Sequence, residues 1–224
     1  MRRVPVVVAL IATFTMYPGF ASGQDSDEHS MSFFLTSVNI GKGANLGGLA
    51  GADAHCQTLA EAVGAGARTW RAYLSTSTVN ARDRIGKGPW YNFNGQLIAT
   101  NLTDLHDNND NITTDNSYTE SGGKIPGLED EENATHDMLT GTKADGTLAL
   151  VQEGLAGIAE HQTGDPATCA DWTGGDGRVR VGHFDSQVGE PGTVWNSAHY
   201  SLGCSQEDIE KTASVGLFYC FASD

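Results

Sequence analysis

The sequence predicts a single α+β domain with short strands, one or two helices and long loops. Apolar residues recur in short runs separated by segments rich in Gly, Asn and Asp, and one segment has a clear helical periodicity. Four cysteines follow an N-terminal apolar segment of the kind that directs export, so we expect disulfide bonds. About 200 residues would remain after removal of that segment, enough for one sizeable domain.

Residues 1–23 are expected to be a signal peptide. Arg2 and Arg3 give a positively charged start, a mostly apolar run extends to Phe20, and small residues follow it. Two prolines and two threonines interrupt the run, which is also short for a membrane span, so an anchor is the less favoured alternative. The protein is therefore expected to be secreted, extracellular or periplasmic, with no membrane span after signal cleavage.

Two regions are expected after the signal peptide: an acidic flexible leader at residues 24–31 and a folded domain at residues 32–224. The formal net charge is −15, from 13 Lys and Arg against 28 Asp and Glu. Such a surface repels nucleic acid, heparin-like polyanions and anionic lipid, and it attracts cations such as Ca2+. Solubility alone is a sufficient alternative explanation of the charge.

The first half of the domain is expected to alternate strand, loop and helix. Residues 32–38 are apolar and β-prone, and a glycine-rich loop follows them. The next segment places Asp53 near a helix start and ends at Gly64, a residue suited to a helix C-terminus. Its apolar face carries Cys56, Leu59, Ala60 and Val63.

A half-buried strand is expected at residues 69–75. Trp70, Ala72 and Leu74 alternate there with Arg71 and Tyr73. The pair Asn94-Gly95 predicts a hairpin turn.

The second half is expected to contain one long loop and several short strands. Residues 101–132 are polar, rich in Asn and Asp and without clear periodicity, and loops of this length are often functional. Residues 152–162 contain too many glycines for an assignment. The further strands are expected at residues 139–142, 179–182 and 215–221.

The chain contains the motifs Gly47–Cys56 and Arg71–Ser75 and the closing cysteines Cys169, Cys204 and Cys220. Together these motifs resemble endostatin, the C-terminal domain of collagens XV and XVIII. The chain is also similar to a group of bacterial secreted lectin-like proteins. The motifs for that likeness are Ala81–Gly86, Gly88–Trp90, His136–Gly141, Trp195–His199 and Gly203–Gln206. The resemblance covers roughly residues 32 to 222, in patches.

The resemblance implies a C-type-lectin-like (endostatin-like) fold closed by two nested disulfides. Four cysteines allow three pairings, and the spacing alone does not choose among them. The resemblance implies the pairs Cys56–Cys220 and Cys169–Cys204. It does not imply endostatin's heparin binding, because this chain lacks a basic patch.

The lectin comparison also gives tentative ligand-binding residues, namely Asp185, Glu190, Asn196 and His199. Sugar-binding C-type lectins hold Ca2+ through carboxylate and amide oxygens. Here Ser197 stands where the lectin motif has a carboxylate, so core packing by Trp195 and a structural role for Asn196 are the favoured alternatives. The sequence requires no cofactor, and calcium is the one cofactor kept as an alternative.

Two clusters are tentative metal sites. The first is the oxygen-rich set Asp104, Asp107, Asn109 and Asn111, for which a solvated turn-rich loop is the favoured alternative. The second is the set His136, His183 and His199, which occur near acids in the motifs His136-Asp137, His183-Phe184-Asp185 and His199. If the fold joins these histidines, they could bind a transition metal or perform acid–base chemistry; histidines bonded to loop backbone are the more common case.

The leading functional hypothesis is a secreted, non-catalytic binding module that recognises a glycan or an extracellular protein. The sequence contains no recognised catalytic motif. One alternative is a structural component of a cell surface or matrix without a soluble ligand. The other is a metal-dependent enzyme that uses the histidine cluster.

Overall fold

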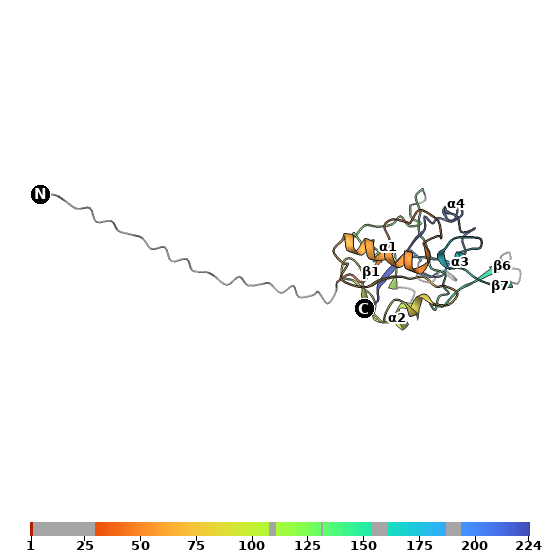
Figure 1. The fold of residues 1–224 in the computed structure, drawn as a ribbon, viewed down its shortest axis with the longest axis horizontal. Coiled ribbons are helices and arrows are strands. Elements are labelled where there is room, and N and C mark those ends of the chain that lie inside the picture. The colour runs from red at the N-terminus through yellow and green to blue at the C-terminus, as the bar shows by residue number, and fades with distance from the viewer. Residues whose placement is uncertain (2–29, 108–110, 131, 154–160, 187–193) are drawn as a thin grey trace.

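The computed structural model describes Met1 and residues 30–107, 111–130, 132–153, 161–186 and 194–224. In this part of the chain the fold is mixed α+β, with few helices, several strands and two disulfides (Figure 1). None of the helices in the described ranges is long and apolar enough to cross a membrane. The expected signal peptide and most of the acidic leader lie outside the described residues.

The secondary-structure elements are short, apart from one helix. The helices are α1 (Gly48–Ala62), α2 (Leu102–Asp107), α3 (Cys169–Trp172) and α4 (Gln206–Glu210), with a 3-10 helix at Ala81–Asp83. The strands are β1 (Phe33–Leu35), β2 (Trp70–Ala72), β3 (Trp90–Tyr91), β4 (Leu97–Ala99), β5 (Asp137–Leu139), β6 (Leu150–Glu153), β7 (His161–Pro166), β8 (Val181–His183) and β9 (Leu217–Ala222). The strands expected at residues 32–38, 69–75 and 215–221 are present but shorter than predicted. The strands expected at residues 139–142 and 179–182 are displaced: β5 shares only Leu139 with the first range, and β8 shares only residues 181–182 with the second.

Strand β9 is the centre of the main sheet. The strand order is β1-β9-β5-β8, and β2 also pairs with β9. All six residues of β9 are buried: Phe218 and Cys220 face one core cluster, and Tyr219 and Phe221 face the other. A strand covered on both faces lacks polar alternation, which is why this segment reads as a continuous apolar run.

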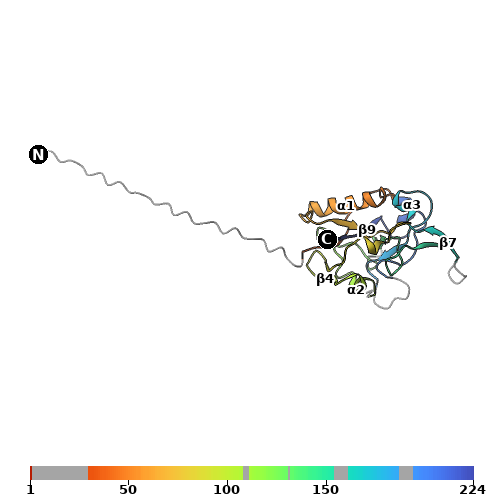
Figure 2. The ribbon, with the colours of Figure 1, turned by 60° about the horizontal axis from the view of Figure 1, so that its bottom comes forward.

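Helix α1 covers one face of the sheet. Figure 2 shows it lying along one side of the domain, above β9. Cys56 on its buried face is bonded to Cys220 of β9, with the two Cα atoms 5.7 Å apart. The helix begins at Gly48, earlier than expected, so Asp53 lies inside it rather than at its start. Asp53 is buried and accepts hydrogen bonds from Arg84 at 2.7 Å and Arg71 at 2.8 Å.

The second face of the sheet is covered by aromatic side chains rather than by solvent. Tyr73 is fully buried in this cluster, with its ring centroid 4.7 Å from that of Trp195 and 5.7 Å from that of Phe221. The expectation that Tyr73 lies on the exposed side of a half-buried strand is therefore wrong. The covering residues come from both halves of the chain, among them Trp90, Leu105 and Trp195, and the local alternation does not reveal them.

The loop regions agree in part with the expectations from the sequence. The turn at Asn94-Gly95 joins β3 and β4, which pair antiparallel, and Gly95 adopts a φ of 72°. The expected long loop contains helix α2, so it is less irregular than predicted. The segment left unassigned contributes β6 and β7, which pair with each other.

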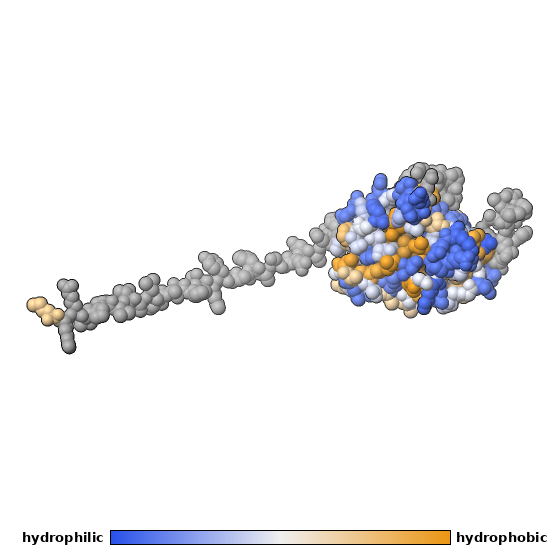
Figure 3. All heavy atoms as spheres, turned by 90° about the horizontal axis from the view of Figure 1, so that it is seen from above, coloured by the Kyte–Doolittle hydropathy of each residue, from blue (hydrophilic) through white to orange (hydrophobic). Residues whose placement is uncertain are grey.

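The exposed surface mixes hydrophilic and apolar residues, as the face in Figure 3 shows. The exposed large apolar side chains of the folded part come from separate segments: Val38, Val63, Val79, Phe93, Leu97, Leu128 and Leu202. Scattered apolar side chains are normal on a soluble protein surface and do not by themselves indicate a partner.

Candidate metal centre

Three histidines converge on the carboxylate of Asp137. Asp137 opens β5 and lies directly opposite His183, the last residue of β8, in an antiparallel pair. His136 precedes β5. His199 lies in a segment that bonds to β8, because its carbonyl oxygen accepts from the Val181 amide at 2.9 Å. Residues facing each other across paired strands meet on one face, so the register brings these side chains together.

A glycine allows the His199 segment to approach β8. A Cβ atom on Gly182 would lie 2.0 Å from the Trp195 carbonyl oxygen and 2.5 Å from the Asn196 Cα. The Ala198 amide also donates to the Val181 carbonyl at 2.7 Å. A larger residue at position 182 would therefore separate His199 from the strand that carries His183.

The imidazoles surround the carboxylate at short distances. His183 Nε2 lies 3.0 Å and His136 Nε2 lies 3.4 Å from Asp137 Oδ1, while His199 Nε2 lies 3.3 Å from Oδ2. The Asp137 side chain is fully buried, whereas the His199 side chain is 43 % exposed. The cluster is therefore enclosed by protein around Asp137 and reaches solvent at His199.

Hydrogen bonds to the Nδ1 atoms, the ring nitrogens farther from Asp137, set the tautomers of His136 and His199. His136 Nδ1 lies 2.9 Å from Asp185 Oδ1, and His199 Nδ1 lies 3.3 Å from the Tyr200 carbonyl oxygen. Both partners are acceptors, so each Nδ1 carries the proton in the neutral ring and each Nε2 presents a lone pair. Those lone pairs face the centre, where the Asp137 carboxylate also lies.

The central contacts are close but do not have hydrogen-bond geometry. Both carboxylate oxygens of Asp137 and the Nε2 atom of His183 are buried without a hydrogen-bond partner. The imidazole nitrogens lie 3.0–3.4 Å from these oxygens, and in the neutral tautomers of His136 and His199 no N–H group points at the carboxylate. Buried polar atoms of native proteins are normally satisfied, so this set calls for a further partner.

The charges in the centre perturb one another. Burial alone would raise the pKa of Asp137, but the neighbouring His183 and His199 outweigh it and hold that pKa below its usual value. Asp137 in turn raises the pKa of His199. The pKa of Asp185 is lowered as well, because His136 and the Leu128 amide outweigh the opposing effect of burial.

The arrangement can hold a metal ion. One nitrogen each from His136 and His183 and one oxygen of Asp137 lie within 4.8 Å of one another. In the described ranges no other group of three His, Cys, Asp or Glu residues meets this condition. His199 is not part of that compact trio and lies at its exposed side. The sequence named the three histidines but missed Asp137 as their common partner, although it directly follows His136.

The described members of the other candidate metal site lie in or beside α2, and two of them bond within this region. Asp104 accepts from the Thr100 amide at 2.7 Å and from its hydroxyl at 2.9 Å, so it acts within its own turn. The Asn111 side chain donates to the Asp104 carbonyl at 2.7 Å. Asp107 is exposed, and Asn109 lies outside the described residues. The favoured alternative, a turn-rich loop, agrees with these contacts.

The candidate ligand-binding residues have different surroundings: Asp185 and His199 lie at the histidine centre, whereas Asn196 belongs to another set of buried polar contacts. Asn196 is fully buried and donates to the Tyr73 hydroxyl at 2.9 Å and to the Lys143 and Ala144 carbonyls at 3.2 and 3.1 Å. These contacts agree with the favoured alternative, a structural role for Asn196. Asp185 is 3 % exposed, and Glu190 lies outside the described residues.

Sequence reasoning missed a buried polar chain next to Asn196. His106 Nδ1 donates to the Leu102 carbonyl at 2.7 Å, and its Nε2 accepts from the Tyr73 hydroxyl at 2.7 Å. Burial lowers the pKa of His106 and raises that of Tyr73 far above its usual value. An isolated histidine in an apparently polar loop gave no signal of this burial.

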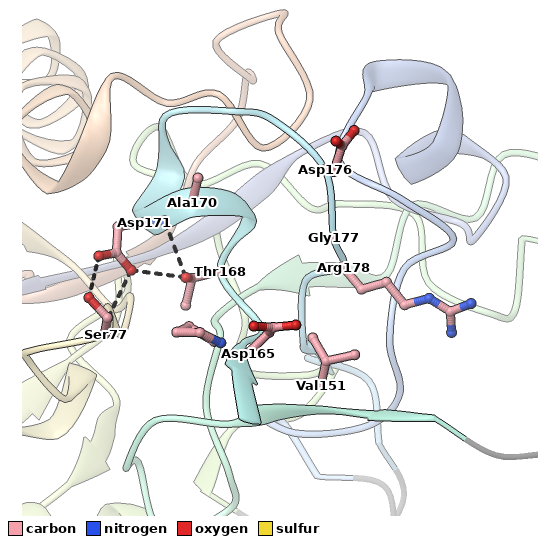
Figure 4. Close-up of a pocket in the computed structure, with 10 residues that line it drawn as sticks. Ser77, Val151, Asp165, Thr168, Ala170, Asp171, Asp176, Gly177 and Arg178 are labelled. Atoms are coloured by element: carbon pink, nitrogen blue, oxygen red, sulfur yellow. Dashed lines mark hydrogen bonds between the residues drawn. The ribbon is translucent and has the colours of Figure 1, made fainter. Parts of the chain in front are cut away.

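A pocket lies beside the disulfide between Cys169 and Cys204. Its volume is about 470 Å3, and charged residues in its lining include Asp165, Asp171, Asp176 and Arg178. Figure 4 shows Asp171 turned toward Ser77 and Thr168, while the Arg178 side chain extends away from them. The Ser77 amide and the Thr168 hydroxyl donate to Asp171 at 2.8 and 3.0 Å.

The turn α3 beside this pocket is left-handed. Its four residues have φ between 49° and 68°, and none of them is glycine. This conformation costs roughly 1–2 kcal/mol per residue, so surrounding contacts must hold it. The Cys169–Cys204 disulfide and the bond from Trp172 Nε1 to the Ser75 carbonyl at 2.6 Å do so.

Comparison with known proteins gives no assignment. No protein-family model matches the chain, and no curated protein sequence matches it significantly. The function is therefore argued from the geometry of the site.

Proposed function

We propose that the protein is an extracellular domain that binds a divalent transition-metal ion through His136, Asp137 and His183. The supporting observation is that His136 Nε2 and His183 Nε2 lie 3.4 and 3.0 Å from Asp137 Oδ1, while the buried carboxylate and His183 Nε2 have no hydrogen-bond partner. A cation between these groups would satisfy the carboxylate and the nitrogens together. Without such a cation, the fold would bury polar atoms at a cost of about 1–3 kcal/mol for each unsatisfied group.

Zinc is the ion that best fits this set of donors. Two imidazole nitrogens and one carboxylate oxygen are common ligands of Zn2+, which accepts three protein ligands and leaves a fourth position open. Ca2+ prefers six to eight oxygen ligands, and the centre offers one carboxylate. The open side lies at His199, which would either complete the coordination or face a ligand bound there. This open side keeps the metal-dependent enzyme as an alternative within the same proposal.

The finer fold assignment, a C-type-lectin-like domain of the endostatin type, is part of this proposal. Its support is the nested pair of disulfides, which is the pairing that the resemblance implies. Further support is the position of β1 beside β9, which joins the two ends of the domain. Disulfides are typical of exported proteins, so we also propose secretion.

The proposal is tested by metal analysis and by titration. Protein purified without chelator should contain zinc in near-stoichiometric amount, and the chelated protein should rebind it in calorimetry. His183→Ala should abolish tight binding because it removes one of the compact trio. The matched control is His55→Ala, which removes an imidazole on α1 that contacts the Val38 carbonyl instead. Zinc binding that is absent, or that survives His183→Ala unchanged, would refute the metal centre.

A second candidate is recognition of a glycan or protein at the pocket beside the Cys169–Cys204 disulfide. The pocket's volume of about 470 Å3 and its mixed charges favour it. Retention on a glycan array should then be lost in Arg178→Ala and retained in His183→Ala. Retention that depends on zinc and on His183 would assign binding to the metal centre instead.

A further inference from the structure

We propose that Asp185 is the positioning residue of the metal centre and that it couples metal binding to the exposed segment 126–130. This inference rests on the proposed function, because it concerns how the same centre is held. It assigns a role to the buried carboxylate of Asp185 that metal coordination by the compact trio does not use.

The carboxylate of Asp185 joins the centre to the segment 126–130. Its side chain is 3 % exposed, and its Oδ1 atom lies 2.9 Å from His136 Nδ1. Its other oxygen, Oδ2, accepts from the Leu128 amide at 2.7 Å. One carboxylate therefore receives one donor from a proposed metal ligand and one from the backbone of an exposed segment.

The segment 126–130 is shaped to make this contact. A Cβ atom on Gly127 would lie closest to Glu129 Oε2 and 2.8 Å from Asp185 Oδ2, so a side chain at this position would displace both carboxylates. The Pro126 carbonyl accepts from the Thr135 amide at 3.0 Å, which ties the start of the segment to the residue before His136. The segment and the ligand are thus held together by two independent contacts.

The second hydrogen bond of a metal-bound histidine fixes its tautomer and its orientation. Loss of such a partner typically weakens metal binding about 10–100-fold. A bound cation also draws electron density from the ring, which makes the Nδ1 proton of His136 a stronger donor to Asp185. Metal binding should therefore hold Asp185 more firmly in place, together with the Leu128 amide, from which Asp185 accepts a hydrogen bond.

The substitution Asp185→Asn tests this without changing the size of the side chain. Two donors reach the two oxygens of Asp185, but an amide has only one acceptor end. Either the Leu128 amide loses its partner, or His136 must accept at Nδ1 and carry its proton on Nε2. The second arrangement blocks the nitrogen that would bind the metal.

We expect zinc affinity to fall about 10–100-fold in Asp185→Asn, with an altered absorption spectrum of the Co2+-loaded protein. The matched control is Asp130→Asn, which also removes one negative charge; Asp130 lies in the segment that Asp185 contacts, but its side chain bonds to Asn133 rather than to a histidine. It should bind zinc like the wild type. A second variant, Gly127→Ala, keeps the carboxylate but displaces it, and it should weaken binding in the same direction.

Hydrogen–deuterium exchange tests the coupling. Zinc should slow exchange at the Leu128 amide in the wild type and leave it unchanged in Asp185→Asn. Wild-type zinc binding together with unchanged affinity and Co2+ spectrum in Asp185→Asn would overturn the positioning role alone. Unchanged exchange at Leu128 on zinc binding would overturn the coupling. Absence of zinc binding in the wild type would overturn the proposed function and this inference together.

Discussion

The substitution Asp137→Asn is the most direct test of the role of charge in the centre. Asp137 is fully buried, contributes the one carboxylate within reach of three imidazoles and has no hydrogen-bond partner for either oxygen. The amide has the same shape, so the substitution removes the negative charge and replaces one acceptor oxygen with an NH2 donor. A neutral ligand in this position would bind a divalent cation much more weakly.

The size of the effect follows from ligand linkage. A ligand at one hundred times its dissociation constant stabilises the folded state by about 2.7 kcal/mol. For a domain of this size, each kcal/mol shifts the melting temperature by about 2–4 °C, so zinc should raise it by about 5–10 °C. A hundred-fold loss of affinity in Asp137→Asn would leave about 0.4 kcal/mol at the same zinc concentration.

Differential scanning calorimetry with zinc and with a chelator measures the zinc-dependent shift of the melting temperature in the wild type and in Asp137→Asn. The matched control is Asp83→Asn, an exposed aspartate that bonds to Asn80 away from the centre. It should keep the full zinc-dependent shift. A shift in Asp137→Asn as large as that of the wild type would show that the carboxylate is not a ligand and would refute the assignment.

Three further predictions concern the fold around the centre. Removal of the disulfide by the double substitution of Cys56 and Cys220 with Ala should lower the free energy of unfolding by up to about 5 kcal/mol in a loop-entropy model, measured by urea unfolding. Gly182→Ala should destabilise the fold by about 1–3 kcal/mol and weaken zinc binding, because its Cβ would collide with the Trp195 carbonyl; full stability with full affinity would contradict the close approach. Burial lowers the folded-state pKa of His106, so the unfolded chain binds the proton more readily. The contribution of His106 to stability should therefore be complete above its ordinary pKa of 6.5 and should be lost as the pH falls below that value. His106→Gln should remove this part of the pH dependence of unfolding.

Local sequence patterns predicted much of the secondary structure. The Asn94-Gly95 turn, the helix carrying Cys56 and the apolar run of the last strand are properties of neighbouring residues. The predicted ends of these elements were less accurate: α1 begins at Gly48, where no capping side chain marks the start. The burial of Tyr73 was missed because the residues that cover it come from distant loops.

The metal centre could be predicted only in part because it depends on register. His136 and His183 belong to different segments that meet through three residue pairs between β5 and β8. A slip of one residue would turn Asp137 to the other face of the sheet, and strands this short contain too little pattern to fix the pairing. The sequence could name histidines near acids, but the identity of the shared carboxylate came from the register.

The disulfide and the proposed metal site act on the same part of the sheet. Cys220 lies in β9, which is bonded to α1 through Cys56 and pairs in parallel with β5, the strand that carries Asp137. A ligand set held by constrained strands loses little conformational freedom when an ion binds, which favours affinity. Because β9 supports β5, loss of the disulfide should also loosen the placement of Asp137 against His183. The effects of disulfide removal and of zinc removal on stability should therefore be non-additive, as is typical of interactions that share one structural element.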